Sequence, residues 1–186
     1  MSQISAEDRK RAYINKMHAE LAGLARQGIV MSGNAFSSVL LLKGDLSVEE
    51  RGGVPLLSGE DGEALRRGLI ALGYVPGDGS ALSVLSDDYV SSLDPLLLRE
   101  AVCALDPVTL LTLDDRASQS LQGAYADELS CIKDINVAKL RPGLVAHVLG
   151  MRFMNLGGFA EALKDSQRKQ FVWACLKRVP PLKEPY

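Results

Sequence analysis

The chain has 186 residues, a formal net charge of −2, and hydrophobic residues at 47% of its positions. This composition is ordinary for a globular protein, and the length suits one domain with one core. A weakly acidic chain has no overall attraction to phosphate backbones, so nucleic-acid binding would require a local basic patch. We predict a single domain over 1–186, with an N-terminal helix in 1–28 and an extended tail in 180–186.

Several classes of site are disfavoured by the residues present. The three cysteines, Cys103, Cys131 and Cys175, form no CxxC pair, and the two histidines are far apart, so neither a disulfide framework nor a zinc site is expected. Phosphate-loop, dinucleotide-binding and nucleophile-elbow motifs are all missing, and we expect no cofactor. The N-terminus does not resemble a signal peptide, and no apolar run approaches the roughly 18–20 residues that span a bilayer. We therefore expect a cytoplasmic protein without a membrane partner.

The N-terminal segment has the pattern of a helix. Ser5 and Asp8 resemble a capping box, and Gly28 can end the helix. Apolar residues recur between them at helical spacing, namely Tyr13, Met17, Leu21 and Leu24. The polar and small residues of 29–38 predict a connection without regular structure.

The first strand and helix form the first half of a βαβ unit. The apolar run Val39–Leu42 ends at Lys43, Gly44 and Asp45, and after a loop a helical pattern runs over Glu60–Leu72 to Gly73. Ligands of open α/β sheets bind at the carboxyl ends of the strands. We therefore predict that the Gly44–Gly59 loop forms a wall of the site.

Later segments repeat the strand and helix pattern. Apolar runs predict further strands over Ala81–Leu85, Val108–Leu113 and Leu144–Leu149. Between them, Asp94 and Pro95 begin a helix that continues to Leu105, and Asp114 with Asp115 can cap another. The last helix is predicted over Ser166–Arg178, with Phe171, Val172, Cys175 and Leu176 buried. Residues 124–143 show no firm period, 150–158 are predicted to be a loop, and Phe159–Leu163 a helical turn.

This alternation predicts an α/β fold, a three-layer α/β/α sandwich around a central, mainly parallel four-stranded sheet. Right-handed crossovers place the loops after the four strands on one edge. Polar residues of those loops should therefore gather there, and they include Asp45, Asp87, Asp88, Asp114, Arg152 and Asn155. This grouping follows from the topology and not from a motif.

The order of short motifs resembles that of the uracil-DNA glycosylase superfamily, especially its compact bacterial branches. That family opens with Gly-Glu-Ala-Pro-Gly after a strand, then acidic residues, Gly-x-Pro-Phe and a glycine-led helix. The corresponding residues here are Gly44-Asp45, Glu49-Glu50, Gly53-Val54-Pro55-Leu56 and Gly59-Glu60-Asp61-Gly62-Glu63-Ala64-Leu65. Pro95-Leu96-Leu97-Leu98-Arg99-Glu100, Pro107 with its strand, and the Trp-containing last helix also match. The resemblance spans roughly 39–179 and implies the glycosylase-like fold.

The resemblance implies roles for some of these residues. A polar residue of the first motif positions the attacking water in that family, which assigns this role to Asp45; an ordinary surface aspartate is the other interpretation. Gly44, Pro55 and Leu56 would line the ligand, although Leu56 replaces the aromatic ring that stacks on uracil. No asparagine follows the second strand, where Asp87 lies. The His-Pro-Ser loop is also missing.

Two basic residues leave alternatives open. Either Gly150-Met151-Arg152 replaces the missing loop, or His147 is the family's histidine in a shifted register; a hydrogen-bonded core histidine is a third possibility. Arg152 is a candidate to bind a phosphate or carboxylate bidentately, with Asn155 nearby.

These departures favour a divergent member without standard base excision. We predict that its cleft binds a nucleobase- or nucleotide-like ligand, or nucleic acid. One alternative is an active DNA glycosylase, a DNA-repair hydrolase with rearranged motifs, which would flip a base into a dry pocket. The other is an interaction module whose cleft is filled by its own side chains, such as Met151, Phe153 and Met154.

Overall fold

A computed structural model describes residues 7, 15 and 19–182 of the chain. Its centre is a six-stranded mixed sheet with the order β1-β3-β2-β4-β6-β5. The four central strands are parallel, namely β3 (Ser80–Ser86), β2 (Val39–Lys43), β4 (Thr109–Thr112) and β6 (Met151–Asn155). The edge strands β1 (Ile29–Gly33) and β5 (Val145–Val148) are antiparallel to their neighbours. The predicted α/β class is confirmed, and the predicted number of four strands is wrong.

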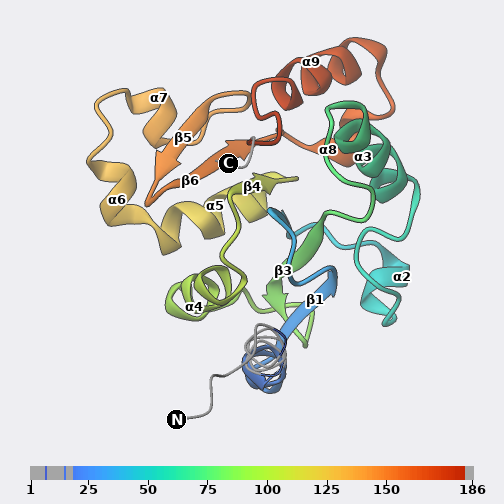
Figure 1. Ribbon diagram of the computed structural model, residues 1–186, viewed down its shortest axis with the longest axis vertical. Helices are drawn as coiled ribbons and strands as arrows, with labels where there is room; N and C mark the ends of the chain where they lie inside the picture. Colours follow the sequence, from blue (N-terminus) through green and yellow to red (C-terminus); the bar gives the residue numbers. More distant parts are fainter. Residues whose placement is uncertain (1–6, 8–14, 16–18, 183–186) are drawn as a thin grey trace.

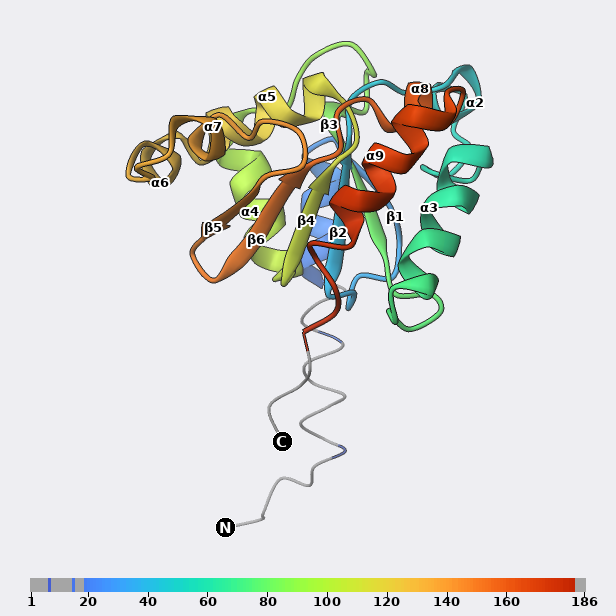
Figure 2. The same ribbon diagram turned by 90° about the horizontal axis from the view of Figure 1, so that it is seen from above.

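Helices cover both faces of this sheet (Figures 1 and 2). One face packs against α4 (Pro95–Leu105), α5 (Asp115–Ala124) and the helix that covers 19–26, and the other against α3 (Glu60–Ala71), α8 (Phe159–Ala162) and α9 (Ser166–Leu176). Successive side chains of a strand point to opposite faces, so Leu40 and Leu42 belong to the first core while Val39 and Leu41 belong to the second. By the same alternation, Lys43 points to the α3 side.

Short-range signals fixed the helix ends as expected. The Asp94 side chain caps α4 by accepting from the N–H groups of Leu96 and Leu97, with Pro95 at the first helical position. Asp114 caps α5 by accepting from the Ala117 N–H. Three short helices, α2 (Val48–Arg51), α6 (Ala126–Ser130) and α7 (Ile135–Ala138), were not predicted. Helices of one turn carry too few residues to show a period.

The predicted fourth parallel strand is instead half of a hairpin. Leu149 (φ 50°) and Gly150 (φ 85°) form a left-handed turn, which reverses the chain from β5 into β6. The strand parallel to β4 is therefore β6, within the segment predicted to be a loop. The polar residues Arg152 and Asn155 made this segment look like a loop in the sequence. It is nevertheless a buried strand, because it pairs with β4 on one side and with β5 on the other.

Two further predictions, one for the segment before β2 and one for the last helix, were wrong. Residues 29–33 form edge strand β1 rather than a connection, and Phe171 is 49% exposed on α9. The helix over 19–26 and its end at Gly28 (φ 86°) agree with the prediction, and Leu24 packs into the core. Ser5, Asp8, Tyr13 and Met17 lie outside the described residues. Within 19–182, no helix has the length and apolar character needed to cross a bilayer.

Candidate functional site

An open pocket of about 770 Å³ lies at the carboxyl edge of the parallel strands. Its walls come from the segments that follow β2 and β4, from the start of α3 and from α8. The chain leaves β2 toward α3 on one face and leaves the adjacent β4 toward α5 on the other. Ligands of open α/β sheets bind in the crevice where the connections diverge in this way. The predicted Gly44–Gly59 wall therefore does line a pocket.

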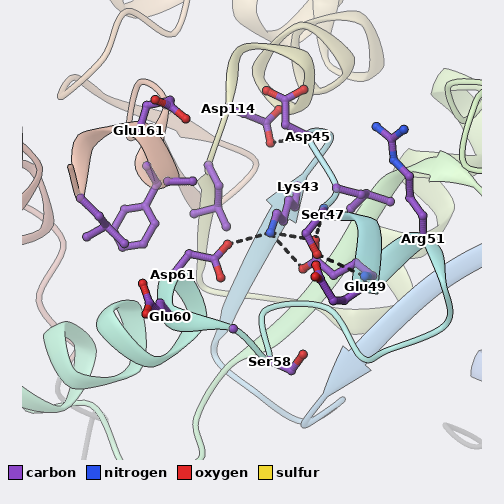
Figure 3. A pocket seen from close by; sticks show the side chains of 18 of the residues that line it. Lys43, Asp45, Ser47, Glu49, Arg51, Ser58, Glu60, Asp61, Asp114 and Glu161 are labelled. Carbon is purple, nitrogen blue, oxygen red and sulfur yellow. Dashed lines mark hydrogen bonds and ion pairs between the residues drawn. The ribbon is translucent and has the colours of Figure 1, made fainter.

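A buried ion-pair network forms the floor of this pocket (Figure 3). Lys43 Nζ donates to Glu50 Oε1 (2.9 Å) and to Asp61 Oδ2 (2.7 Å), and Lys43 and Glu50 are 5% and 4% exposed. Burial opposes the lysine charge, but the hydrogen bonds and charges of Asp61 and Glu50 outweigh it and raise the pKa of Lys43. The network joins the end of β2 to the starts of α2 and α3.

Glu50 also fixes the loop that borders the pocket. Its Oε2 accepts from the Ser47 N–H (2.8 Å) while Ser47 caps α2, which completes a capping box. Its Oε1 accepts from the Leu57 N–H (2.8 Å) as well as from Lys43. One carboxylate thus ties together the strand end, the short helix and the second half of the loop.

Asp114 holds the turn that carries Asp45. Asp114 Oδ2 accepts from the backbone N–H groups of Gly44 (2.8 Å) and Asp45 (3.0 Å), and its Oδ1 caps α5. A Cβ at Gly44 would lie 2.7 Å from the Arg116 Cβ, so the turn requires glycine there. The Asp45 backbone is therefore held by the residue that caps α5, while its side chain is exposed at the pocket.

Asp45 is an exposed carboxylate of this pocket, and its pKa is shifted. Partial burial and the neighbouring Asp114 charge raise the pKa of Asp45, and the Arg116 guanidinium opposes the shift. A carboxylate with a raised pKa is a better proton acceptor in catalysis than an ordinary surface aspartate. The side chain can accept an N–H from a ligand when it is ionised.

An aromatic and apolar wall faces the acidic loop. Phe159, the first residue of α8, lines the pocket and is 4% exposed, and its N–H donates to the Leu113 carbonyl (2.7 Å). Leu46, Val54 and Leu163 add apolar surface. The pocket thus combines an aromatic side chain with an accessible carboxylate.

The lining carries more negative than positive charge. Seven acidic residues line the pocket, namely Asp45, Glu49, Glu50, Glu60, Asp61, Asp114 and Glu161, against the three basic residues Lys43, Arg51 and Lys164. Lys43 is bound by the buried Glu50 and the half-buried Asp61, and Lys164 pairs with Glu161 (2.7 Å). In the described part of the chain, no ion pair neutralises Asp45, Glu49 or Glu60. Such a pocket repels phosphate groups and attracts N–H donors or cations.

The predicted site residues divide between different places. Gly44 and Asp45 form the edge of the pocket, whereas Pro55 and Leu56 line a second, separate cavity. Asp87 follows β3 on the carboxyl edge but lies beside Gly28 at the start of β1 and lines neither cavity. Leu56 and Asp87 therefore do not share the pocket of Asp45, and the ligand contacts predicted for them stay predictions.

Asn155 is close to the predicted edge but has a structural role. Its Nδ2 donates to Ser118 Oγ (3.2 Å) and to the Leu140 carbonyl (3.1 Å), and its Oδ1 accepts from the Gly157 N–H (2.8 Å). The side chain is 4% exposed. Asn155 thus anchors the α7 segment and the turn after β6, and it does not line the pocket.

Arg152 and His147 lie at the opposite edge from Asp45. Arg152 pairs in register with Thr109 at the amino end of β4, and His147 is its partner on β5. Arg152 is buried and donates to Thr109 Oγ1 and to the Tyr74 hydroxyl, whereas His147 is exposed on an edge strand. The predicted grouping of Arg152 with Asp45 is wrong, because the hairpin moves Arg152 to the start of a strand. His147 is neither a core histidine nor near Asp45.

The pocket is also not plugged in the way that the interaction module requires. Phe153 and Met154 are fully buried on opposite faces of β6, and neither they nor Met151 line it. Within 19–182, no cluster of three or more His, Cys, Asp and Glu side chains is arranged to hold a metal ion.

Sequence reasoning missed the buried network and the aromatic wall. Lys43 ends an apolar run, and a lysine on the inward face of a buried strand predicts carboxylate partners. The Ser47-x-x-Glu50 spacing of a capping box was also visible. Phe159 had no comparable signal, because its place beside Leu113 at the end of β4 depends on the position of β6.

No protein-family model matches the chain, and no curated protein matches it.

Proposed function

We propose that the protein binds a small nucleobase-like ligand in the Asp45 pocket, as a divergent member of the uracil-DNA glycosylase superfamily without standard base excision. The observation that carries this proposal is the pairing of Phe159 with the exposed carboxylate of Asp45 at the carboxyl edge of β2. A planar base presents an apolar face and an edge of N–H donors, and these match an aromatic wall and a carboxylate acceptor.

The negative charge of the pocket favours one of the three ligand classes predicted from the sequence, which are a nucleobase, a nucleotide and a nucleic acid. Asp45, Glu49 and Glu60 surround the opening without ion-pair partners in the described residues. A nucleic-acid backbone or a nucleotide phosphate would meet these carboxylates and be repelled. An uncharged base or nucleoside avoids that cost, so we favour it over a nucleotide or a nucleic-acid strand.

The binding test compares ligands and two aspartates of the same edge. Calorimetric titration of uracil, the other nucleobases, their nucleosides and their monophosphates should give saturable binding for a base or nucleoside and weaker binding for its monophosphate. Asp45→Asn should weaken binding by about tenfold, because the ligand loses one charge-assisted hydrogen bond. Asp87→Asn is the matched control, because Asp87 is exposed on this edge but outside the pocket. Equal effects of the two substitutions, or no binding of any base, would refute the proposal.

A second candidate function is base excision, which the raised pKa of Asp45 favours. In that reaction Asp45 accepts a proton from the water that attacks the sugar carbon, and the base leaves with the bonding electrons. The assay is release of uracil from a single-stranded oligonucleotide. Release that is abolished by Asp45→Asn and retained by Asp87→Asn would establish the enzyme. No release at high protein concentration would exclude it and leave the binding function.

A further inference from the structure

A second cavity, of about 410 Å³, lies between α3, the end of β1 and the turn that leads into β3. It is separate from the Asp45 pocket, and among the described residues only Ser58 lines both. Its floor is apolar and includes Leu41, Leu57 and Leu69, which are all buried in the core on the α3 face. A cavity of this size admits a small ligand, and such a floor favours one with an apolar body.

The polar groups around this cavity differ in how far they are already used. Asp78 is engaged on both carboxylate oxygens, which accept from the Ser38 N–H (3.0 Å) and hydroxyl (2.8 Å). The Ser32 hydroxyl donates to the Leu56 carbonyl (3.0 Å). Arg66 donates from Nη1 to the Leu57 carbonyl (2.9 Å), and no carboxylate among the described residues pairs with it. The guanidinium of Arg66 is therefore a positively charged group of this lining with donors left for a ligand.

The wall that positions Arg66 is held from several sides. Leu57 has a left-handed backbone (φ 56°), and its N–H is bound by the buried Glu50 carboxylate (2.8 Å). Gly62 lies so close that a Cβ there would be 1.8 Å from the Leu57 carbonyl oxygen. The carbonyl that accepts from Arg66 is thus fixed before any ligand arrives, which reduces the ordering cost of binding.

We propose that this second cavity binds a small ligand that joins an apolar body to a carboxylate, with the body on the leucine floor and the carboxylate on Arg66. A guanidinium can bind a carboxylate through two parallel hydrogen bonds, which fixes the orientation of the ligand. The acidic pocket beside it would repel the same ligand. This site does not depend on the function proposed for Asp45.

The experiment uses two probes that share one apolar body, namely naphthoate and the uncharged naphthamide. Fluorescence titration of the whole chain should show saturable binding of naphthoate, with naphthamide at least about tenfold weaker. Arg66→Gln should reduce naphthoate affinity to that of naphthamide, and Arg66→Lys should give an intermediate value. Arg67→Gln is the matched control, because Arg67 follows on the same helix, is exposed and pairs with Glu63. Thermal melting checks that each variant is folded.

Amide chemical shifts then locate the probe. Naphthoate should move the amide signals of Ser32, Gly77 and Gly79, which line the cavity, and leave those of Asp45 and Glu161 in place. Equal affinities for the two probes, equal losses in Arg66→Gln and Arg67→Gln, shifts confined to the Asp45 pocket, or no saturable binding would each overturn the proposal.

Discussion

Two basic side chains are buried on the same face of the sheet, at its opposite edges. Lys43 ends β2 and is 5% exposed, and Arg152 lies at the start of β6 and is 7% exposed. Lys43 is bound by two carboxylates, while the hydrogen bonds of Arg152 go to the hydroxyls of Thr109 and Tyr74. At the carboxyl edge, the charge of Lys43 is therefore neutralised by carboxylates beneath an open pocket. At the amino edge, the charge of Arg152 is stabilised by hydrogen bonds to uncharged hydroxyls.

This difference shows why the same residue type has different consequences at each edge. Removing Lys43 would leave the buried Glu50 carboxylate without its cation. Removing Arg152 leaves only hydroxyls, one of which already donates to the Val179 carbonyl (2.7 Å). A buried charge that loses its partner is far more costly than a hydroxyl that does. The comparison can be tested at both positions by substitution with methionine, which preserves most of the apolar volume.

The largest effect is expected for Lys43→Met. Because Glu50 stays buried and unpaired, we expect the free energy of unfolding to fall by about 3–5 kcal/mol. Urea denaturation measures the change. Lys164→Met is the control, since its pair with Glu161 is exposed and should contribute less than about 1 kcal/mol. A Lys43→Met protein as stable as the wild type would show that the network is not a stabilising element.

A smaller effect is expected for Arg152→Met. The substitution loses hydrogen bonds of a charged donor but also removes the cost of burying that charge, so we expect a loss of about 1–2 kcal/mol. Both variants are compared in the same urea titration. If Arg152→Met lost as much stability as Lys43→Met, or more, the unpaired Glu50 carboxylate would not be the costlier loss.

Alkaline pH should weaken the Lys43 network without a mutation. The pKa of Lys43 is raised above its ordinary value of 10.5, so its stabilising effect is complete below that pH and is lost as the pH rises through the higher folded value. Burial also raises the pKa of Tyr125 to about 12, which destabilises the fold above pH 10 in the wild type and in the variant alike. The stability difference between the wild type and Lys43→Met should therefore shrink above pH 10.5. A difference that is constant across this range would contradict the assignment.

The smallest effect is expected at Asp45. Its pKa is raised, so the ionised form is disfavoured in the folded state, and stability is gained as the pH falls through the folded value toward 3.8. Asp45→Asn should stabilise the protein at pH 7 by a few tenths of a kcal/mol, because the side chain is exposed and screened by solvent. The gain should vanish near pH 3. If the stability gain of Asp45→Asn grew as the pH fell, the pKa of Asp45 would be lowered in the folded state and not raised.

The fold was predictable where local signals were sufficient. Strands β2, β3 and β4 lie in short segments rich in apolar residues, and Asp94 and Asp114 mark helix starts through their capping side chains. The error at β5 and β6 came from Leu149, whose left-handed backbone gives no clue in a leucine. One unrecognised turn converted a single parallel strand into a hairpin and moved Arg152 from the end of a strand to the start of one.

The site was predictable only in part, for a related reason. Gly44 and Asp45 follow directly from the end of β2, so sequence alone placed them at the carboxyl edge. The partners of Lys43 come from 7 and 18 residues further along the chain, and Phe159 comes from beyond β6. Their approach depends on how α2, α3 and α8 pack, which periodicity does not encode.

The central claim is that a base-like ligand occupies the pocket between Asp45 and Phe159. The most direct measurement is amide chemical-shift mapping during titration with the base or nucleoside that binds most tightly. We predict saturable shifts at Asp45, Ser58, Asp61 and Phe159, all of which line that pocket, and none at Arg152 or His147. Shifts confined to the amino edge, or no saturable shift with any nucleobase or nucleoside, would contradict the account.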